Sequence, residues 1–281
     1  MNDSIERLRA ARGFVFDLDG TLVLGDNNNK GLRPLPGAVE LTQHLDKRGI
    51  PIAILTNGTT RPPQAYAEML RGMGFAVRDE RMLTPSAVAA EYLAREGFKR
   101  VLALGGEGVQ KPLADAGLDV TMSTQNVKAD EKFDAVFVGW FREFTFTDLE
   151  KACNAAWNGA KIFSASLAPF FATTQGRTLS TSRAICAVVT SITGAEPTVL
   201  GKPSLEALQC ASRRTQIDCS QLVVVGDDPS LEIAMAHAGG SLGVAVHTGV
   251  GHHDSYDKLP AEEQPHIAVQ NAQELLKLYV G

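Results

Sequence analysis

Two carboxylates stand two residues apart in the stretch FDLDGT (16–21), directly after a short apolar run. A carboxylate that leaves a buried strand is costly unless something needs its charge. We expect Asp17 to attack phosphorus as a nucleophile, while Asp19 protonates the leaving oxygen and later deprotonates a water molecule. Gly20 permits a tight turn whose backbone N–H groups can hold phosphate oxygens. A surface turn is the alternative, because Asp-Gly pairs are common in turns.

Two further groups able to bind phosphate occur downstream. Thr56, Asn57 and Gly58 follow the apolar run 52–55 and offer a hydroxyl, an amide and backbone N–H groups as phosphate ligands. An ordinary helix N-cap would explain the same residues. Lys202 stands in Gly-Lys-Pro after a short apolar pair, and it could neutralise phosphoryl oxygens and restrain the Asp17 carboxylate. A solvated surface lysine is the alternative there.

A second acidic pair could hold a metal. Asp227 and Asp228 follow a glycine at the end of the most apolar run of the chain. With Asp17 they supply hard oxygen ligands of the kind that Mg²⁺ prefers. We expect Asp227 to be a direct ligand, and Asp228 to act through water or to cap the helix that follows. Glu232, one turn along that helix, is expected to support the site without binding the metal.

The elements that must position these groups are short apolar strands alternating with helices. The helical spacing of apolar residues is clear in 37–48 and in 203–214. Such alternation, with strands apolar throughout, predicts a parallel sheet covered on both faces. Ligands of such sheets bind beyond the carboxyl ends of the strands, so Asp17, Thr56 and Asp227 are expected to converge. The predicted strands are 14–16, 52–55, 101–104, 135–138, 222–225 and 244–246.

More than a hundred residues separate Thr56 from Lys202, and they contain strand and helix patterns of their own. We therefore expect a second α/β domain inserted into the first. The predicted division is a core domain in two parts, 1–85 and 182–281, with the inserted domain at 86–181. We expect the loops 139–144 and 164–171 of the inserted domain to select the substrate.

Charge and cysteine content narrow the class of protein. The net charge of −5 disfavours nucleic acid and anionic membrane as partners. The four cysteines are scattered without a CxxC pair, which indicates a reducing compartment rather than disulfides or zinc. Residues 1–12 are polar and charged, and no apolar run reaches membrane-spanning length. These features together predict a cytoplasmic protein.

Three other features are interpreted as structural. The glycine-rich string 105–108 does not match the dinucleotide-binding pattern. The adjacent histidines and aspartate at 252–254 are more typical of a loop than of a metal site. The aromatic pairs 140–141 and 170–171 are expected to be core or domain-interface residues.

The four groups occur in the order of the four motifs of the haloacid dehalogenase-like (HAD) superfamily, which this chain resembles. The long insertion and the strings TNG (56–58) and VLGKPS (199–204) resemble subfamily IIA, which includes NagD-type and p-nitrophenylphosphate phosphatases. The resemblance implies a Rossmann-like core with an inserted α/β cap. It implies Mg²⁺ held by the Asp17 carboxylate, the Asp19 backbone carbonyl and Asp227. Thr56 and Lys202 would contact phosphate, and a homodimer could form through the cap.

Two positions depart from this subfamily. Many relatives have Thr-Asn-Pro-Asp in the cap where this chain has Ser-Leu-Ala-Pro at 166–169. The fourth motif often ends in aspartate where Glu232 stands here.

The expected activity is hydrolysis of a small phosphorylated metabolite through an aspartyl-phosphate. A phosphomutase could use the same Asp17 and Asp19, and a non-catalytic binding module could have kept the fold. Release of free phosphate without a bisphosphate activator would separate the first two alternatives. An intact Asp19 argues against the third, because a retired site does not need an acid–base group.

Overall fold

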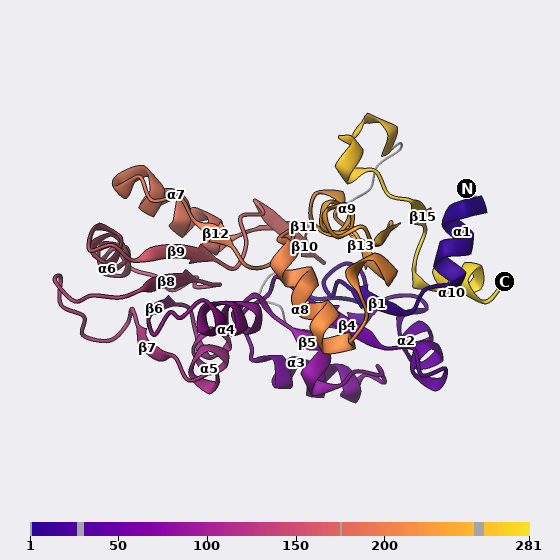
Figure 1. The fold of residues 1–281 in the computed structure, drawn as a ribbon, viewed down its shortest axis with the longest axis horizontal. Coiled ribbons are helices and arrows are strands. Elements are labelled where there is room, and N and C mark those ends of the chain that lie inside the picture. The colour runs from indigo at the N-terminus through magenta and orange to yellow at the C-terminus, as the bar shows by residue number, and fades with distance from the viewer. Residues whose placement is uncertain (1, 27–30, 175, 250–255) are drawn as a thin grey trace.

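The chain forms two lobes that lie side by side (Figure 1). The computed structural model describes residues 2–26, 31–174, 176–249 and 256–281. Both termini lie at the outer end of one lobe, which we call the core lobe (Figure 1). The other lobe, which we call the cap, is built from the middle of the chain. Within the described residues, no helix has the length and apolar character needed to cross a membrane.

The core lobe contains a six-stranded sheet in the order β15-β14-β13-β1-β4-β5, with every neighbouring pair parallel. Alternate residues of β1 face opposite sides, so Phe14 and Phe16 join one apolar cluster and Val15 joins another. Both faces are therefore covered by helices, as the continuous apolar pattern predicted. The strands are β1 (Gly13–Phe16), β4 (Ile52–Leu55), β5 (Met82–Leu83), β13 (Leu222–Gly226), β14 (Leu242–Val246) and β15 (Ile267–Val269).

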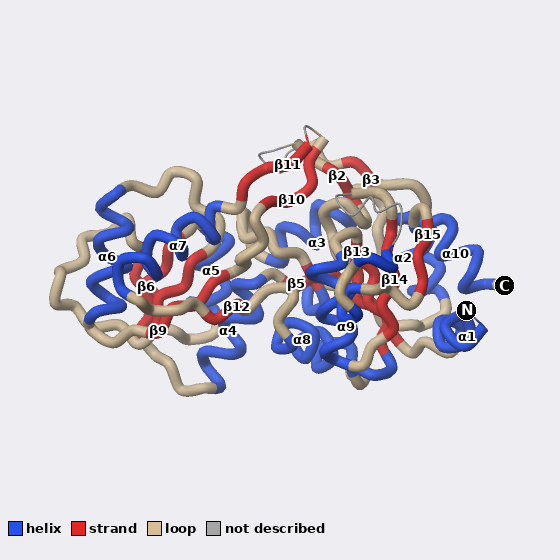
Figure 2. The backbone as a smooth tube through the Cα atoms, turned by 90° about the horizontal axis from the view of Figure 1, so that it is seen from above, coloured by secondary structure: helices blue, strands red, loops and turns tan. Residues whose placement is uncertain are grey.

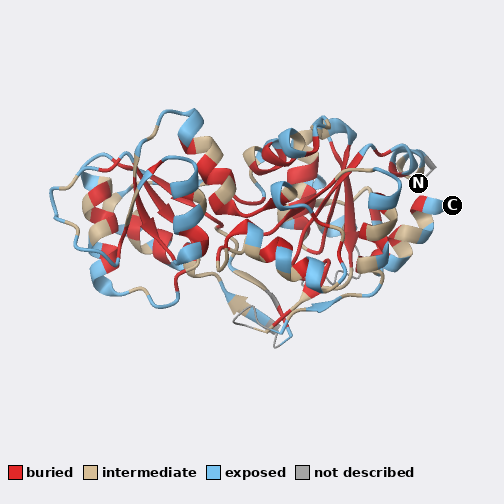
Figure 3. Cartoon of the chain, turned by 90° about the horizontal axis from the view of Figure 1, so that it is seen from below, coloured by how far each residue is buried: buried red, intermediate tan, exposed pale blue. Residues whose placement is uncertain are grey.

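Two layers of helices cover this sheet. One face packs against α1 (Asn2–Arg9), α2 (Ala38–Lys47), α3 (Pro63–Gly72) and α10 (Ala272–Val280). The other face packs against α8 (Leu205–Thr215) and α9 (Ala234–Gly239). The α/β architecture with a parallel sheet is confirmed. In Figure 3 the strands of the two central sheets are buried, and the exposed residues lie on the outer faces of the helices, on loops and on the hairpin β10–β11 described below.

The cap contains a five-stranded parallel sheet in the order β12-β9-β8-β6-β7. Helices α4 (Pro85–Arg95) and α5 (Glu107–Asp115) cover one face, and α6 (Phe146–Trp157) and α7 (Thr181–Thr193) cover the other. A capping box between Thr145 and Asp148 begins α6. The strands are β6 (Arg100–Leu104), β7 (Asp119–Met122), β8 (Ala135–Val138), β9 (Lys161–Ser164) and β12 (Thr198–Val199).

The end of the inserted segment differs from the expected boundary at 181. Helix α7 packs on α6, and β12 pairs with β9 of the cap sheet. The sequence pattern did not reveal this, because a two-residue strand and an amphipathic helix fit either lobe. We propose that the cap runs from α4 to β12 and that the core lobe resumes just before Lys202.

A hairpin bridges the two lobes. Strands β10 (Phe170–Thr173) and β11 (Gly176–Leu179) pair antiparallel and extend from the cap toward β2 (Val23–Leu24) and β3 (Arg33–Pro34) of the core lobe (Figure 2). The backbone N–H of Thr174 donates to the carbonyl of Gly25 at 2.8 Å. The hairpin is thus tied to the core beside the loop that carries Asp17 and Asp19.

Two glycines of the cap allow its close approach to the core. A Cβ atom on Gly108 would overlap the backbone oxygen of Thr59, and one on Gly139 would lie 2.8 Å from the Thr59 hydroxyl. That hydroxyl accepts a hydrogen bond from the N–H of Trp140 at 2.7 Å. The string 105–108 therefore serves packing between the lobes.

Candidate active site

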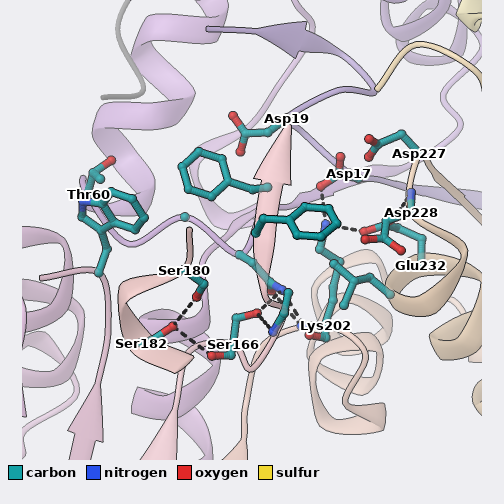
Figure 4. Close-up of a pocket in the computed structure, with 17 residues that line it drawn as sticks. Asp17, Asp19, Thr60, Ser166, Ser180, Ser182, Lys202, Asp227, Asp228 and Glu232 are labelled. Carbon is teal, nitrogen blue, oxygen red and sulfur yellow. Dashed lines mark hydrogen bonds and ion pairs between the residues drawn. The ribbon is translucent and has the colours of Figure 1, made fainter. Parts of the chain in front are cut away.

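The carboxyl ends of β1, β4 and β13 meet at one edge of the core sheet, and a pocket opens there between the core and the cap (Figure 4). Pairing of Phe16 with Val225 brings Asp17 beside Asp227, as the sequence predicted. Lys202 enters from the segment after β12. Asp17, Asp19, Asn57, Gly58, Lys202 and Asp227 all line this pocket, whose space is about 820 Å³ including its open mouth.

Asp17 and Lys202 form a buried ion pair at the base of the pocket. The Lys202 Nζ atom donates to Asp17 Oδ1 and also lies 2.7 Å from Glu232 Oε1. Lys202 is only 2% exposed, so it is not the solvated surface lysine of the alternative interpretation. Burial opposes the charge of Lys202, but the carboxylates of Asp17 and Glu232 raise its pKa above the ordinary value. The lysine is therefore charged and fixed against Asp17.

Asp19 is held in an environment that favours its protonated form. Burial, and next the negative charge of Asp17, raise its pKa from 3.8 to about 6. The Thr56 hydroxyl donates to Asp19 Oδ2 at 3.0 Å and accepts from the N–H of Gly58 at 2.9 Å. This side chain can donate a proton near neutral pH and take it back, as an acid–base group requires.

The raised pKa of Asp19 predicts a stability effect. Its folded-state pKa lies above 3.8, so ionisation destabilises the protein as pH rises from about 4 to 6, and the loss persists at higher pH. Asp19→Asn keeps an acceptor for Thr56 and removes this charge. We expect it to raise the free energy of unfolding by about 1–2 kcal/mol at pH 8, a value reduced for the partial exposure of Asp19. Urea unfolding with chelator present measures this, and an equal gain at pH 4 would contradict it.

The residues beside Asp17 fit a divalent cation. Asp17 Oδ2 is buried and has no hydrogen-bond partner among the described residues. Asp227 is 4% exposed, and its carboxylate lies so close to Gly20 and Gly249 that a Cβ on either would crowd its oxygens. No three His, Cys, Asp or Glu side chains in the described ranges form a metal-binding group. The carboxylates of Asp17 and Asp227, together with the backbone carbonyl of Asp19, are oxygen donors of the type that Mg²⁺ accepts.

Asp228 and Glu232 have structural partners. The Asp228 carboxylate accepts from the N–H of Ser230 at 3.0 Å and so caps the π-helical turn Pro229–Ile233, as predicted. Glu232 accepts from the N–H of Asp228 at 3.0 Å while its other oxygen pairs with Lys202. Burial is the main cause that raises the pKa of Glu232. Glu232 therefore supports the lysine.

Comparison with protein families agrees with this geometry. Residues 14–119 match the model described as haloacid dehalogenase-like hydrolase, and residues 199–275 match the HAD-hydrolase-like model. The two matches contain all the groups that converge on the pocket from the core lobe. The chain belongs to the HAD hydrolases.

Relatives of this HAD hydrolase are phosphatases. It is 28% identical over 244 residues to the 5'-nucleotidase YutF of Bacillus subtilis, covering 86% of this chain and 90% of the relative. It is 29% identical to an acid sugar phosphatase of Staphylococcus haemolyticus, covering 90% of each chain.

Solved structures share the whole fold. NagD from E. coli K-12 matches with a TM-score of 0.81 at 26% identity, covering 94% of this chain and 98% of NagD. Glycerol phosphate phosphatase Rv1692 from Mycobacterium tuberculosis, solved with calcium, matches with a TM-score of 0.81 at 26% identity, covering 96% of this chain and 76% of the other. The resemblance to NagD-like HAD proteins is thus confirmed.

The side-chain amide of Asn57 contacts protein groups in this HAD hydrolase, whereas we expected it to contact phosphate. Its Nδ2 donates to Ser166 Oγ and to the carbonyl of Lys202, both at 3.1 Å, and its Oδ1 accepts from the N–H of Lys202 at 2.8 Å. The amide is thus engaged with both the Lys202 backbone and the cap. We propose that Asn57 positions Lys202 rather than binding phosphate directly.

The loops 139–144 and 164–171, which we expected to select the substrate, both contribute residues to the cap wall of the pocket. Trp140, Phe170 and Phe171 line the pocket, although we expected them in the core or at the domain interface. Phe141, by contrast, is 8% exposed and belongs to the cap core as expected. Ser180 and Ser182 also line the pocket; no motif marks them, because they reach it through the hairpin and α7. The residues 252–254 lie outside the described residues.

Proposed function

We propose that this HAD hydrolase is a Mg²⁺-dependent phosphomonoesterase that works through a phosphorylated Asp17. The observation that carries the proposal is the arrangement of two aspartates. Asp17 is fixed by Lys202, its second oxygen has no hydrogen-bond partner in the part of the chain that the structure describes, and Asp19 has a pKa of about 6 in the same pocket. The phosphatase relatives support the same class of activity.

In the first half of the proposed reaction, a carboxylate oxygen of Asp17 attacks phosphorus. The bond from phosphorus to the alcohol oxygen breaks, and the proton of Asp19 passes to that oxygen. Lys202 offsets the negative charge that the phosphoryl oxygens bring beside Asp17. The N–H groups of Gly20 and Gly58 donate to the Val23 carbonyl and the Thr56 hydroxyl, so the proposed phosphate donors are the other backbone N–H groups of the loops 18–21 and 57–60.

In the second half, ionised Asp19 accepts a proton from water, and the water oxygen bonds to phosphorus. The bond between phosphorus and Asp17 then breaks, and phosphate is released. The same Asp19 thus donates a proton in one half and accepts one in the other, which a pKa near neutrality permits. The Thr56 hydrogen bond holds its carboxylate in place for both.

Mg²⁺ would be held by the carboxylates of Asp17 and Asp227 and by the backbone carbonyl of Asp19, and it would supply positive charge against the repulsion between nucleophile and substrate. The calcium in the Rv1692 structure supports a divalent cation in this family.

Metal removal tests the proposal directly. Phosphate release from a panel of phosphomonoesters should disappear with chelator and return when Mg²⁺ is restored in excess. No bisphosphate activator should be needed, which separates hydrolysis from a phosphomutase. Release that continues in chelator would contradict the metal dependence.

The homodimer stays a prediction. Phe146 and Trp157 are 72% and 61% exposed. They are eleven residues apart, which is close to three helical turns, so they lie on the same face of α6. This face of the cap is where we propose that two copies meet.

A further inference from the structure

We propose that Thr248 is a positioning residue for the metal. Its hydroxyl fixes the turn after Asp19 and so holds the oxygen donors of Asp19 and Asp227 in place. This inference rests on the proposed function, because it concerns the Mg²⁺ of the same site. Thr248 belongs to none of the four motifs that the sequence revealed.

The segment that carries Thr248 reaches the site because of the strand order. β14 lies beside β13, and β13 lies beside β1, all parallel, so the carboxyl ends of the three strands meet at one edge. Gly226 pairs with Ala245, so the turn 247–249 comes level with the residues that follow β13. The His247 side chain supports this turn, since its Nε2 lies 3.0 Å from the hydroxyl of Tyr256 and the two rings meet edge to face. The turn is thus built onto the edge that carries the proposed metal donors.

The Thr248 hydrogen bond joins the two backbone segments that enclose Asp227. The Thr248 hydroxyl donates to the carbonyl of Gly20 at 2.5 Å, so it connects the end of β14 to the loop after β1. The Asp227 carboxylate lies between these segments. A Cβ on Gly20 would lie 2.5 Å from Asp227 Oδ2, and one on Gly249 would lie 1.8 Å from the same atom. The two backbones therefore fix the position of Asp227, and Thr248 holds the two backbones together.

The same hydrogen bond completes the support of the Asp19 carbonyl. Gly20 has a φ of +97°, and because glycine restricts its backbone so little, its two peptide groups need partners outside the turn. The N–H of Gly20 donates to the carbonyl of Val23 at 2.8 Å, which orients the planar peptide group that contains the Asp19 carbonyl. The carbonyl of Gly20 is held by Thr248. Without this second hydrogen bond the turn at Gly20 can rotate, and the Asp19 carbonyl loses its fixed direction.

Hydrogen bonds that orient metal ligands have a measurable effect on the metal. Their loss typically lowers metal affinity or activity by about 10–100-fold. Thr248 is not one of the described residues that line the pocket, so it acts on the metal through Gly20 and Asp227 rather than by touching the substrate.

The test measures Mg²⁺ binding to the substrate-free enzyme by titration calorimetry. Thr248→Val keeps the shape of the side chain and removes the donor, whereas Thr248→Ser keeps the hydroxyl. We expect the Kd for Mg²⁺ to rise about tenfold or more in Thr248→Val and to stay near the wild-type value in Thr248→Ser. The Mg²⁺ concentration that gives half-maximal phosphate release should rise by the same factor. Gly249→Ala should also raise the Kd, because the added Cβ displaces the Asp227 carboxylate.

Ser241→Ala is the matched control. Ser241 directly precedes β14, and its hydroxyl donates to the carbonyl of Cys219 at 2.6 Å. This is the same kind of hydrogen bond on the same strand, but at the edge of the sheet opposite to the site. Ser241→Ala should lower the stability toward urea, as Thr248→Val does, and leave the Kd for Mg²⁺ unchanged. Urea unfolding with chelator present measures the stability of each variant without the metal.

Each outcome decides the proposal. A higher Kd in Thr248→Val that is absent from Thr248→Ser and Ser241→Ala supports it. An unchanged Kd in Thr248→Val, or an equal rise in Ser241→Ala, overturns it and leaves the phosphatase function standing. Loss of the fold in Thr248→Val also overturns it, because the hydroxyl would then serve the stability of the whole lobe. Wild-type enzyme that binds no Mg²⁺ overturns both this proposal and the metal dependence of the proposed function.

Discussion

Replacing Asp17 with asparagine is expected to lower kcat by about 10⁴-fold or more for every phosphomonoester that the enzyme hydrolyses. The amide has nearly the shape of the carboxylate but cannot attack phosphorus, so the first covalent bond does not form. Lys202 keeps Glu232 as a partner at 2.7 Å, so the fold should survive the change. Phosphate release under saturating substrate and Mg²⁺ measures the effect.

The matched control is Asp115→Asn. Asp115 is half exposed on α5 and pairs with Lys111 four residues earlier at 3.0 Å, and neither residue lines the pocket. An exposed pair of this kind contributes little to stability, so this variant should retain wild-type kcat. Turnover by Asp17→Asn within tenfold of this control would exclude Asp17 as the nucleophile.

The second large effect is expected at Lys202. Lys202→Met removes the cation that faces Asp17 and Glu232 and leaves two carboxylates buried together. Breaking a buried ion pair in this way typically costs about 3–5 kcal/mol of unfolding free energy. Activity should fall by at least about a hundredfold, because the phosphoryl charge is no longer offset.

The dependence on pH identifies the cause. Burial already raises the folded-state pKa of Glu232, and removal of the lysine removes a charge that lowers it, so the stability loss from this carboxylate is full at pH 8 and shrinks as pH falls. The double variant Lys202→Met with Glu232→Gln removes one stranded charge. It should regain part of the stability at pH 8 but none of the activity. Recovery of activity in the double variant would show that Lys202 acts through Glu232 rather than on the substrate.

The central residues of this site could be predicted from the sequence because they directly follow predicted strands. Asp17 and Asp227 are the first polar residues after two apolar runs that pair as parallel neighbours, so their convergence followed from the strand pattern alone. Lys202 was harder to judge, since a lysine between glycine and proline is usually exposed. Its burial depends on β12 joining the cap sheet, which a two-residue strand does not reveal.

The cap side of the pocket could be predicted only in part, because the loops 139–144 and 164–171 were expected to select the substrate but their aromatic rings were not placed in the pocket. Phe170 and Phe171 were assigned to the core or to an interface, because aromatic pairs in an apolar context are usually buried. Their place in the pocket is set by the hairpin and its contact with Gly25, a link between residues far apart in the chain. Asn57 shows the same limit. Its residue type suited phosphate binding, and only the fold showed that its amide is engaged by Lys202 and Ser166.

The central claim is the covalent bond between Asp17 and phosphorus, and rapid acid quenching during turnover tests it most directly. Enzyme mixed with a good substrate and Mg²⁺ should show the mass increase of one phosphoryl group, located by peptide mapping to the segment that contains Asp17 and absent from Asp17→Asn. With p-nitrophenyl phosphate, whose leaving group departs without a proton from Asp19, Asp19→Asn should accumulate the same species, because the water that hydrolyses it lacks its base. Turnover without any phosphorylated enzyme, or a phosphoryl group on another residue, would contradict the mechanism.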